Sequence, residues 1–190
     1  MKRMAVILLA CTMIFTLSAC GATPPADASD SSALEQKEGK FPLSSISTVT
    51  LDGEAITGDA LSGEKLTVVN VWGTWCPPCV EELPHLQEVS ELYADQGVKI
   101  VGVLQDGVTA GLEPDDALIS AGKKLLEDAG AEYTVILPDE PLMLDIIAQM
   151  QYFPTTFFID SENNIIKTVI GSNDVDGWRQ EIDEALAELS

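Results

Sequence analysis

The strongest constraint in this sequence is a continuous apolar run that ends shortly before a Cys-x-x-Cys pair. The run from Thr67 to Val71 is typical of a strand in the middle of a sheet, and a helix is expected from just after Cys76 to about Asp95. Cys76 would therefore stand at a helix N-terminus, where the helix dipole stabilises a thiolate and lowers the pKa of the thiol. This pattern predicts a redox-active cysteine pair between a buried strand and a helix.

The two cysteines are expected to have different roles. Cys76 is the candidate attacking sulfur, while Cys79 lies one helical turn further on, more buried, and resolves the mixed disulfide that Cys76 forms. Pro77 and Pro78 lack backbone N–H groups, so fewer donors point at the Cys76 sulfur than another dipeptide would allow. We therefore expect a moderate depression of the pKa of Cys76.

The N-terminus predicts export and lipidation. Lys2 and Arg3 precede an apolar run from Met4 to Leu17 that is too short to span a bilayer and is typical of a signal peptide. The Leu-Ser-Ala-Cys tetrad that ends at Cys20 resembles the bacterial lipobox, which predicts a lipoprotein signal peptide over residues 1–19 and a diacylglyceryl group on Cys20. Two acyl chains give a lasting membrane anchor. Plain secretion is the alternative.

Between the predicted anchor and the domain lies a segment rich in Gly, Ala, Pro, Asp and Ser. Residues 20–45 have little apolar periodicity and are expected to form a flexible, lipid-anchored tether, followed by a single domain over residues 46–190. The predicted location is extracytoplasmic, on the bacterial cell membrane.

The number of cysteines limits the roles that Cys76 and Cys79 can have. Cys11 leaves with the signal peptide and Cys20 is expected to be blocked by lipid, so Cys76 and Cys79 would be the free thiols of the mature chain. A closed zinc site needs four ligands, and with His85 as the sole histidine no second pair of ligands is available. We expect no metal site.

The rest of the domain alternates strand and helix patterns, which indicates an α/β fold. The expected strands are residues 48–51, 67–71, 99–104, 133–137, 155–159 and 165–170, and the expected helices are 77–95, 115–129, 141–150 and 174–189. The formal net charge of -21, from 10 basic and 31 acidic residues, argues against nucleic-acid binding and favours neutral or basic partners.

The segment over residues 68–79, followed by Glu-Glu-Leu-Pro at 81–84, resembles the thioredoxin-like family of TlpA and ResA type, and the likeness extends from about residue 42 to the C-terminus. It implies a thioredoxin-like fold, with a central mixed β-sheet flanked by helices and an additional helix and strand inserted before a cis-proline segment. Pro84 falls where thioredoxins kink the active-site helix. No cofactor is implied.

The resemblance also implies a substrate surface around the cysteine pair. Trp75 directly precedes the attacking cysteine, as in that superfamily, and the segment from Phe153 to Phe157 resembles the one that carries the cis-proline facing the disulfide. The implied substrate-binding residues are Trp75, Pro77, Pro78, Phe153, Pro154 and Thr155.

A proton acceptor is implied by one departure from thioredoxin. The buried acid six residues before the first active-site cysteine is replaced by Asn70, which cannot accept a proton. Glu82 lies three residues after Cys79 on the same helix face, whereas Glu81 points about 100° away. TlpA-type reductases carry a glutamate at this position, so Glu82 is assigned as the base for the Cys79 proton, with a pKa raised by desolvation. The alternative is a surface charge.

Taken together, these features predict an enzyme that exchanges its dithiol with disulfides of protein substrates. The family implies a reductase, for instance of apocytochrome c or of an oxidised methionine sulfoxide reductase, fed by a membrane electron donor of the CcdA/DsbD type and acting as a monomer. One alternative is a thiol peroxidase of the redoxin group, although its Pro-x-x-x-Thr-x-x-Cys pattern does not precede Cys76. The other is a non-catalytic metal- or solute-binding lipoprotein.

Overall fold

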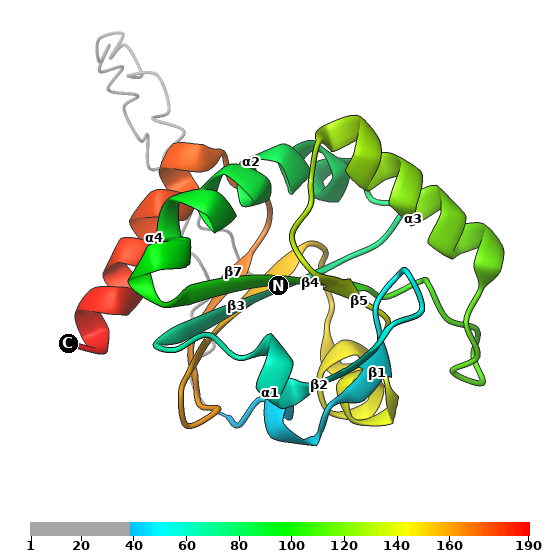
Figure 1. The fold of residues 1–190 in the computed structure, drawn as a ribbon, viewed down its shortest axis with the longest axis horizontal. Helices are drawn as coiled ribbons and strands as arrows, with labels where there is room; N and C mark the ends of the chain where they lie inside the picture. The colour runs from blue at the N-terminus through cyan, green and yellow to red at the C-terminus, as the bar shows by residue number, and fades with distance from the viewer. Residues whose placement is uncertain (1–38) are drawn as a thin grey trace, which may run out of the picture. The chain divides into compact units, whose positions relative to one another are not determined.

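Residues 39–190, which the computed structural model describes, are organised around one mixed β-sheet with helices on both faces (Figure 1). The strand order is β5 (Val135–Ile136), β4 (Val98–Leu104), β3 (Leu66–Trp72), β6 (Thr155–Asp160) and β7 (Ile165–Ile170). Strand β3 is central, pairing in parallel with β4 and antiparallel with β6. The expected α/β class and thioredoxin-like mixed sheet are confirmed.

The apolar run of β3 is buried because the sheet is covered on both faces. Alternate side chains enter two separate cores, with Val68 and Trp72 in one and Val69 and Val71 in the other. The first core lies under α2 (Pro77–Tyr93), α3 (Asp116–Ala129) and α4 (Val175–Glu188), and the second lies under α1 (Gly58–Leu61) and the helical turns around residue 145 (Figure 1). In the part of the chain that the structure describes, no helix is long and apolar enough to cross a membrane.

The insertion before residue 154 differs in detail from its expected form. The strand expected at residues 133–137 pairs with β4 only over Val135–Ile136, because Leu137 N instead donates to the carbonyl of Val49. The helix expected at 141–150 is a π-helix over Leu142–Ile146 followed by a 3-10 turn over Ile147–Gln149.

A two-stranded ribbon lies outside the main sheet. Strand β1 (Ser47–Val49), close to the strand expected at residues 48–51, pairs antiparallel with β2 (Ala55–Thr57), and α1 follows at once. Neither β2 nor α1 was expected, because both are too short to show a hydrophobic period.

The packed domain begins before the expected boundary at residue 46. Phe41 and Leu43 are each 1% exposed in the second core, and Phe41 N donates to the carbonyl of Asn163 at 2.9 Å. The end of the tether expected at residue 45 is therefore corrected toward the N-terminus, because apolar side chains from this segment cover the sheet. The signal peptide, Cys20 and the tether up to residue 38 lie outside the described residues.

Leu43 offers a test of this corrected boundary. Replacing Leu43 with alanine is expected to lower the free energy of unfolding by about 2 to 3 kcal/mol, because a fully buried leucine leaves a cavity when truncated. Denaturant unfolding measures the change, and the neighbouring, exposed Ser44→Ala variant is the control. Equal stability of the two variants would contradict the packing role of this segment.

Candidate active site

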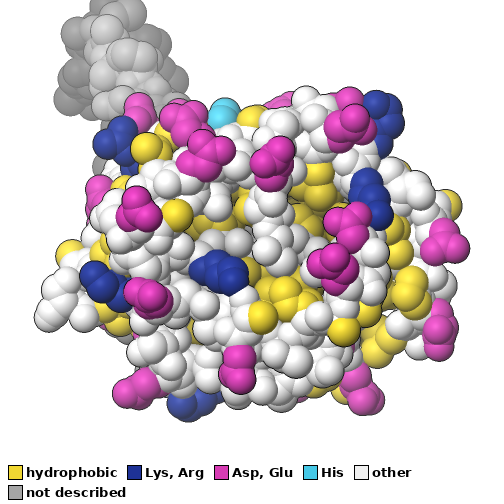
Figure 2. Space-filling model, in the orientation of Figure 1, with side chains coloured by type: hydrophobic (Ala, Val, Ile, Leu, Met, Phe, Trp, Pro, Cys, Tyr) yellow, Lys and Arg dark blue, Asp and Glu magenta, His cyan; other side chains and the backbone are white. Residues whose placement is uncertain are grey.

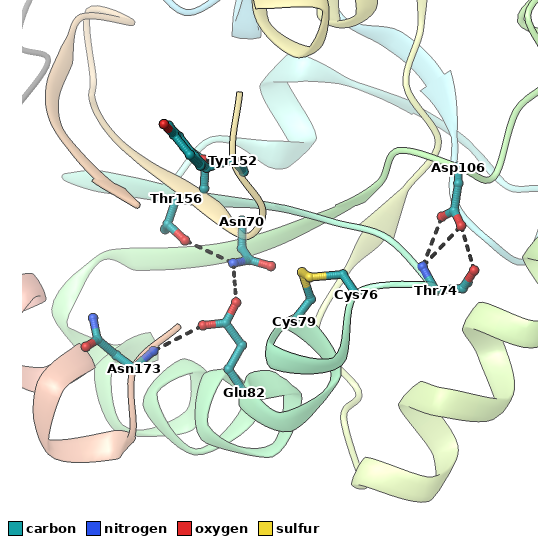
Figure 3. The surroundings of a disulfide bond; sticks show 10 residues. Asn70, Thr74, Cys76, Cys79, Glu82, Asp106, Tyr152, Thr156 and Asn173 are labelled. Carbon is teal, nitrogen blue, oxygen red and sulfur yellow. Dashed lines mark hydrogen bonds between the residues drawn. A yellow bond between two sulfur atoms is a disulfide. The ribbon is translucent and has the colours of Figure 1, made fainter. Parts of the chain in front are cut away.

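Cys76 and Cys79 form a disulfide at the start of α2, directly beyond the C-terminal end of the central strand (Figure 3). The two sulfurs are 2.10 Å apart and the two Cα atoms 5.3 Å apart. Cys76 is the N-cap residue of the helix, with extended backbone, and Pro77 takes the first helical position, where a missing N–H costs no hydrogen bond. The local sequence thus places the first sulfur at the positive end of a helix dipole.

The two cysteines differ in accessibility in the expected order. Cys76 is 3% exposed and Cys79 is fully buried, while Pro77 and Pro78 between them are exposed. A substrate sulfur can approach the pair only from the side of Cys76. This arrangement favours Cys76 as the attacking sulfur and Cys79 as the resolving one.

The peptide bond between Phe153 and Pro154 is cis, as the resemblance implied, and it comes directly before β6. The Phe153 ring packs edge-on against Trp75, with ring centroids 5.4 Å apart and an interplanar angle of 73°. Trp75 is 59% exposed and Tyr152 is 55% exposed, whereas Pro154 and Thr155 are buried. Trp75 and Phe153, expected from separate segments to bind substrate, thus form one aromatic ledge.

Glu82 is buried behind the disulfide on the same helix, with only 1% of its surface exposed. Its Oε1 accepts a hydrogen bond from Asn70 Nδ2 at 2.9 Å, and its Oε2 accepts a longer one from the backbone N–H of Asn173 at 3.4 Å (Figure 3). Asn70 Nδ2 also donates to Thr156 Oγ1 at 2.9 Å. The alternative of a surface charge at Glu82 is wrong, because the carboxyl group lies in the core.

Burial gives Glu82 an unusual titration. Desolvation raises the pKa of Glu82 to about 8, and the hydrogen bonds from Asn70 and Asn173 oppose this shift without cancelling it. The Trp178 indole N–H acts in the same lowering direction, although it has no partner within hydrogen-bond geometry among residues 39–190. In the disulfide form at pH 7, Glu82 is therefore mostly protonated.

Asn70 provides a test of this electrostatic balance. Replacing Asn70 with alanine is expected to raise the pKa of Glu82 further, because the carboxylate loses its stronger hydrogen-bond donor. Carboxyl-carbon NMR titration of the oxidised protein measures the shift. The Asn173 bond comes from the backbone and serves as the internal reference, since it is unchanged in the variant. An unchanged or lower pKa would contradict the assigned role of Asn70.

Several polar groups near Glu82 were not anticipated. Tyr133 is buried, and desolvation followed by the charge of Glu82 raises the pKa of its phenol well above the ordinary value. Four buried polar atoms here lack hydrogen-bond partners within residues 39–190: Asn70 Oδ1, Trp72 Nε1, Tyr133 Oη and Trp178 Nε1. Trp72 is fully buried, so it belongs to the core rather than to the substrate surface.

Two further residues of the site were missed for different reasons. The backbone N–H of Asn173 contacts Glu82, and a backbone donor carries no side-chain signal in a sequence. Asp106 binds Thr74, two residues before Cys76. Its place just after strand β4 could have indicated this, because the carboxyl ends of neighbouring parallel strands meet at one edge of the sheet.

His85 is half-buried and contacts the carbonyl of Asn173 through Nδ1 at 3.1 Å. Within residues 39–190 no cluster of three or more metal-ligating side chains occurs.

A thioredoxin-like fold with a Cys-x-x-Cys disulfide at a helix N-terminus and a cis-proline directly before β6 defines a thiol-disulfide oxidoreductase. Comparison with known proteins agrees with this class. The Redoxin family matches residues 36–186, and the chain belongs to that family.

The curated relatives carry related names. The chain is 28% identical over 139 residues to the thiol-disulfide oxidoreductase ResA of Halalkalibacterium halodurans, covering 73% of this chain and 69% of the relative. It is 30% identical over 142 residues to the thiol:disulfide interchange protein DsbE of Pseudomonas aeruginosa, covering 75% and 71% respectively. The likeness to ResA of Bacillus subtilis, 30% over 121 residues, spans 64% of this chain and 61% of the relative.

Solved structures support the fold. A thiol:disulfide interchange protein of the thioredoxin family from Chlorobium tepidum superposes with a TM-score of 0.59 at 24% identity, covering 83% of this chain and 99% of that one. StoA from Bacillus subtilis superposes with a TM-score of 0.53 at 24% identity, covering 71% and 93%. At these identities the likeness concerns the fold alone.

Proposed function

We propose that this protein is an extracytoplasmic, membrane-anchored reductase of protein disulfides. The observation that carries the proposal is the buried, protonated Glu82 beside a Cys76–Cys79 disulfide at a helix N-terminus. Such a carboxyl group can return a proton to Cys79 when the disulfide is reduced and take it back when the dithiol is spent. Asn70 cannot do this, because an amide does not titrate.

The exchange proceeds in two sulfur displacements. The Cys76 thiolate attacks one sulfur of the substrate disulfide, so that a mixed disulfide forms and the other substrate sulfur leaves as a thiolate that takes a proton from water. Glu82 then accepts the Cys79 proton while the Cys79 sulfur attacks Cys76, which releases the second substrate sulfur as a thiolate that takes a proton from water. The substrate gains two electrons, and the protein ends as the disulfide with Glu82 protonated.

The ledge of Trp75 and Phe153 supports a polypeptide as the substrate. The exposed Trp75 indole directly precedes Cys76 in the chain and packs edge-on against Phe153, the residue before the cis-proline. Figure 2 shows acidic side chains over much of the visible face, and the whole chain carries 31 acidic and 10 basic residues. This charge favours neutral or basic protein partners. Apocytochrome c and an oxidised methionine sulfoxide reductase are the proposed substrates.

Reduction is the proposed direction, with electrons supplied by a membrane donor of the CcdA/DsbD type to a monomeric enzyme. Equilibration with dithiothreitol redox buffers tests the direction, with alkylated thiols counted by mass. We expect a reduction potential below about −200 mV, more reducing than the poise of oxidising compartments. A value near about −120 mV, typical of a strong oxidant, would show that the protein donates disulfides instead.

Membrane attachment rests on Cys20, which follows the lipobox-like tetrad. In the host, the Cys20→Ser variant is expected to move from the membrane fraction to the soluble extracytoplasmic fraction, because it cannot receive the diacylglyceryl group that anchors the mature chain. Fractionation and immunoblotting measure the distribution, with the Ser18→Ala variant as the control. Retention of Cys20→Ser in the membrane to the same extent as the wild type would contradict lipidation at this residue.

A further inference from the structure

The four residues that lead into the active-site helix form a tight turn. Cys76 N donates to the carbonyl of Gly73 at 3.1 Å, and Gln105 N donates to the carbonyl of Trp72 at 2.9 Å, which joins the ends of β3 and β4. The Trp75 indole folds back over Gly73, where an added Cβ would lie 2.8 Å from the indole nitrogen. A side chain at position 73 would therefore displace the Trp75 indole, and the turn sets the position of both Trp75 and Cys76.

Asp106, just beyond β4, holds this turn through Thr74. The carboxylate accepts the Thr74 backbone N–H at 3.2 Å and 3.1 Å through its two oxygens, and the Thr74 hydroxyl donates to Oδ2 at 2.6 Å (Figure 3). Hydrogen bonds to an ionised acceptor are stronger than neutral ones. One acidic side chain thus fastens the centre of the turn, two residues before the attacking sulfur.

We propose that Asp106 is a positioning residue for the exchange reaction, which holds Trp75 and Cys76 in place through Thr74 and opposes the build-up of negative charge on the Cys76 sulfur. This inference rests on the proposed function, in which Cys76 attacks the substrate. The negative charge of Asp106 disfavours the Cys76 thiolate, whereas the helix dipole favours it.

The charge of Asp106 can be separated from that of its neighbours. The other titratable side chains on the elements around Cys76 lie on α2, before β5 and beside the cis-proline: Cys79, Glu81, Glu82, His85, Glu88, Glu91, Tyr93, Tyr133 and Tyr152. All of them stay in place in the variants below. Asp106→Asn keeps an oxygen acceptor and removes the charge, whereas Asp106→Ala removes both.

The first measurement is the pH dependence of iodoacetamide alkylation of Cys76 in the reduced protein. In Asp106→Asn the midpoint is expected to fall, so that alkylation at pH 6 is about threefold to tenfold faster than in the wild type. The control is Asp95→Asn, which removes an exposed acidic charge just beyond the far end of α2. A midpoint in Asp106→Asn equal to that of Asp95→Asn overturns the proposal.

The second measurement reports the position of Trp75. Trp72 and Trp178 are fully buried, so acrylamide quenching of fluorescence reports mainly on Trp75. In Asp106→Ala, quenching and the KM for insulin reduction are both expected to change, the KM rising about tenfold. Thr74→Val, which loses the hydroxyl, should reproduce part of this change. Thr74→Ser, which keeps the hydroxyl, should behave as the wild type. Wild-type quenching and KM in Asp106→Ala would also overturn the proposal.

These measurements also distinguish this inference from the proposed function. Alkylation requires no disulfide substrate, so its pH midpoint tests Asp106 even if the wild type fails to reduce insulin. An inactive wild type with a shifted midpoint in Asp106→Asn would leave the role of Asp106 intact and refute reductase activity.

Discussion

Cells that express the Cys79→Ser variant are expected to accumulate a mixed disulfide between Cys76 and the physiological substrate. Cys79 is fully buried beside Cys76 and is the sulfur that completes the exchange, so its loss stops the reaction after the first displacement. Turnover should fall by roughly 10³-fold or more, as is usual when a residue of a concerted catalytic unit is removed. Non-reducing electrophoresis followed by mass spectrometry identifies the captured protein.

The Cys76→Ser variant is the matched control for trapping. It keeps the buried Cys79 but lacks the accessible sulfur, so it should capture nothing and have no reductase activity. If the Cys76→Ser variant captured the same partners as Cys79→Ser, the assignment of Cys76 as the attacking sulfur would be wrong. Capture of nothing by Cys79→Ser, under conditions where the wild type is active, would contradict exchange with proteins altogether.

Replacing Glu82 with glutamine is expected to slow the resolving step by about 10²-fold to 10⁴-fold, the usual contribution of a positioned proton acceptor. Glutamine keeps the shape and an oxygen for Asn70, but it cannot take the Cys79 proton. Rapid-mixing kinetics with a labelled mixed disulfide measure the step. Glu81→Gln is the control, because this exposed neighbour on the same helix has no contact with the pair's buried side. Equal rates in the two variants would exclude Glu82 as the acceptor.

The same substitution has a signed effect on stability. An unfolded glutamate ionises near pH 4.5, whereas folding raises the pKa of Glu82 to about 8, so between these values the folded state holds a proton that the unfolded state has lost. The contribution of Glu82 to the free energy of unfolding is fully present below pH 4.5. It falls by up to about 1.4 kcal/mol per pH unit as the pH rises to 8. Glu82→Gln should flatten this slope in denaturant unfolding of the oxidised protein, while Glu81→Gln retains it.

The sequence was most informative where local patterns are strong. The apolar run of β3, the helix that follows Cys76 and the amphipathic helices α3 and α4 were all expected close to their observed bounds. The resemblance supplied the cis bond at Pro154, which local chemistry does not reveal. These features fix the relation between strand, disulfide and helix.

The remaining details depend on contacts between distant segments. Phe41 and Leu43 pack on the sheet although their neighbours suggested a tether, and the helix expected at residues 141–150 became a π-helix and a 3-10 turn. Asp106 and Thr74 follow the ends of two neighbouring strands, so the order of the strands indicates that they are close but not that they form hydrogen bonds. The burial of Glu82 was expected from its helix face, but its partner Asn173 was not.

Gly39, the first residue that the structure describes, lies at the end of the central strand opposite to the disulfide. Gly39 accepts a hydrogen bond from Ile165, in the hairpin that begins beside Asp160, and Asp160 pairs with Leu66 at the beginning of β3. The disulfide follows the other end of that strand, roughly 20 Å away along its length. A segment that precedes Gly39 is therefore joined to the described domain at the end of β3 away from Cys76, so the point of attachment does not lie beside the reactive sulfur.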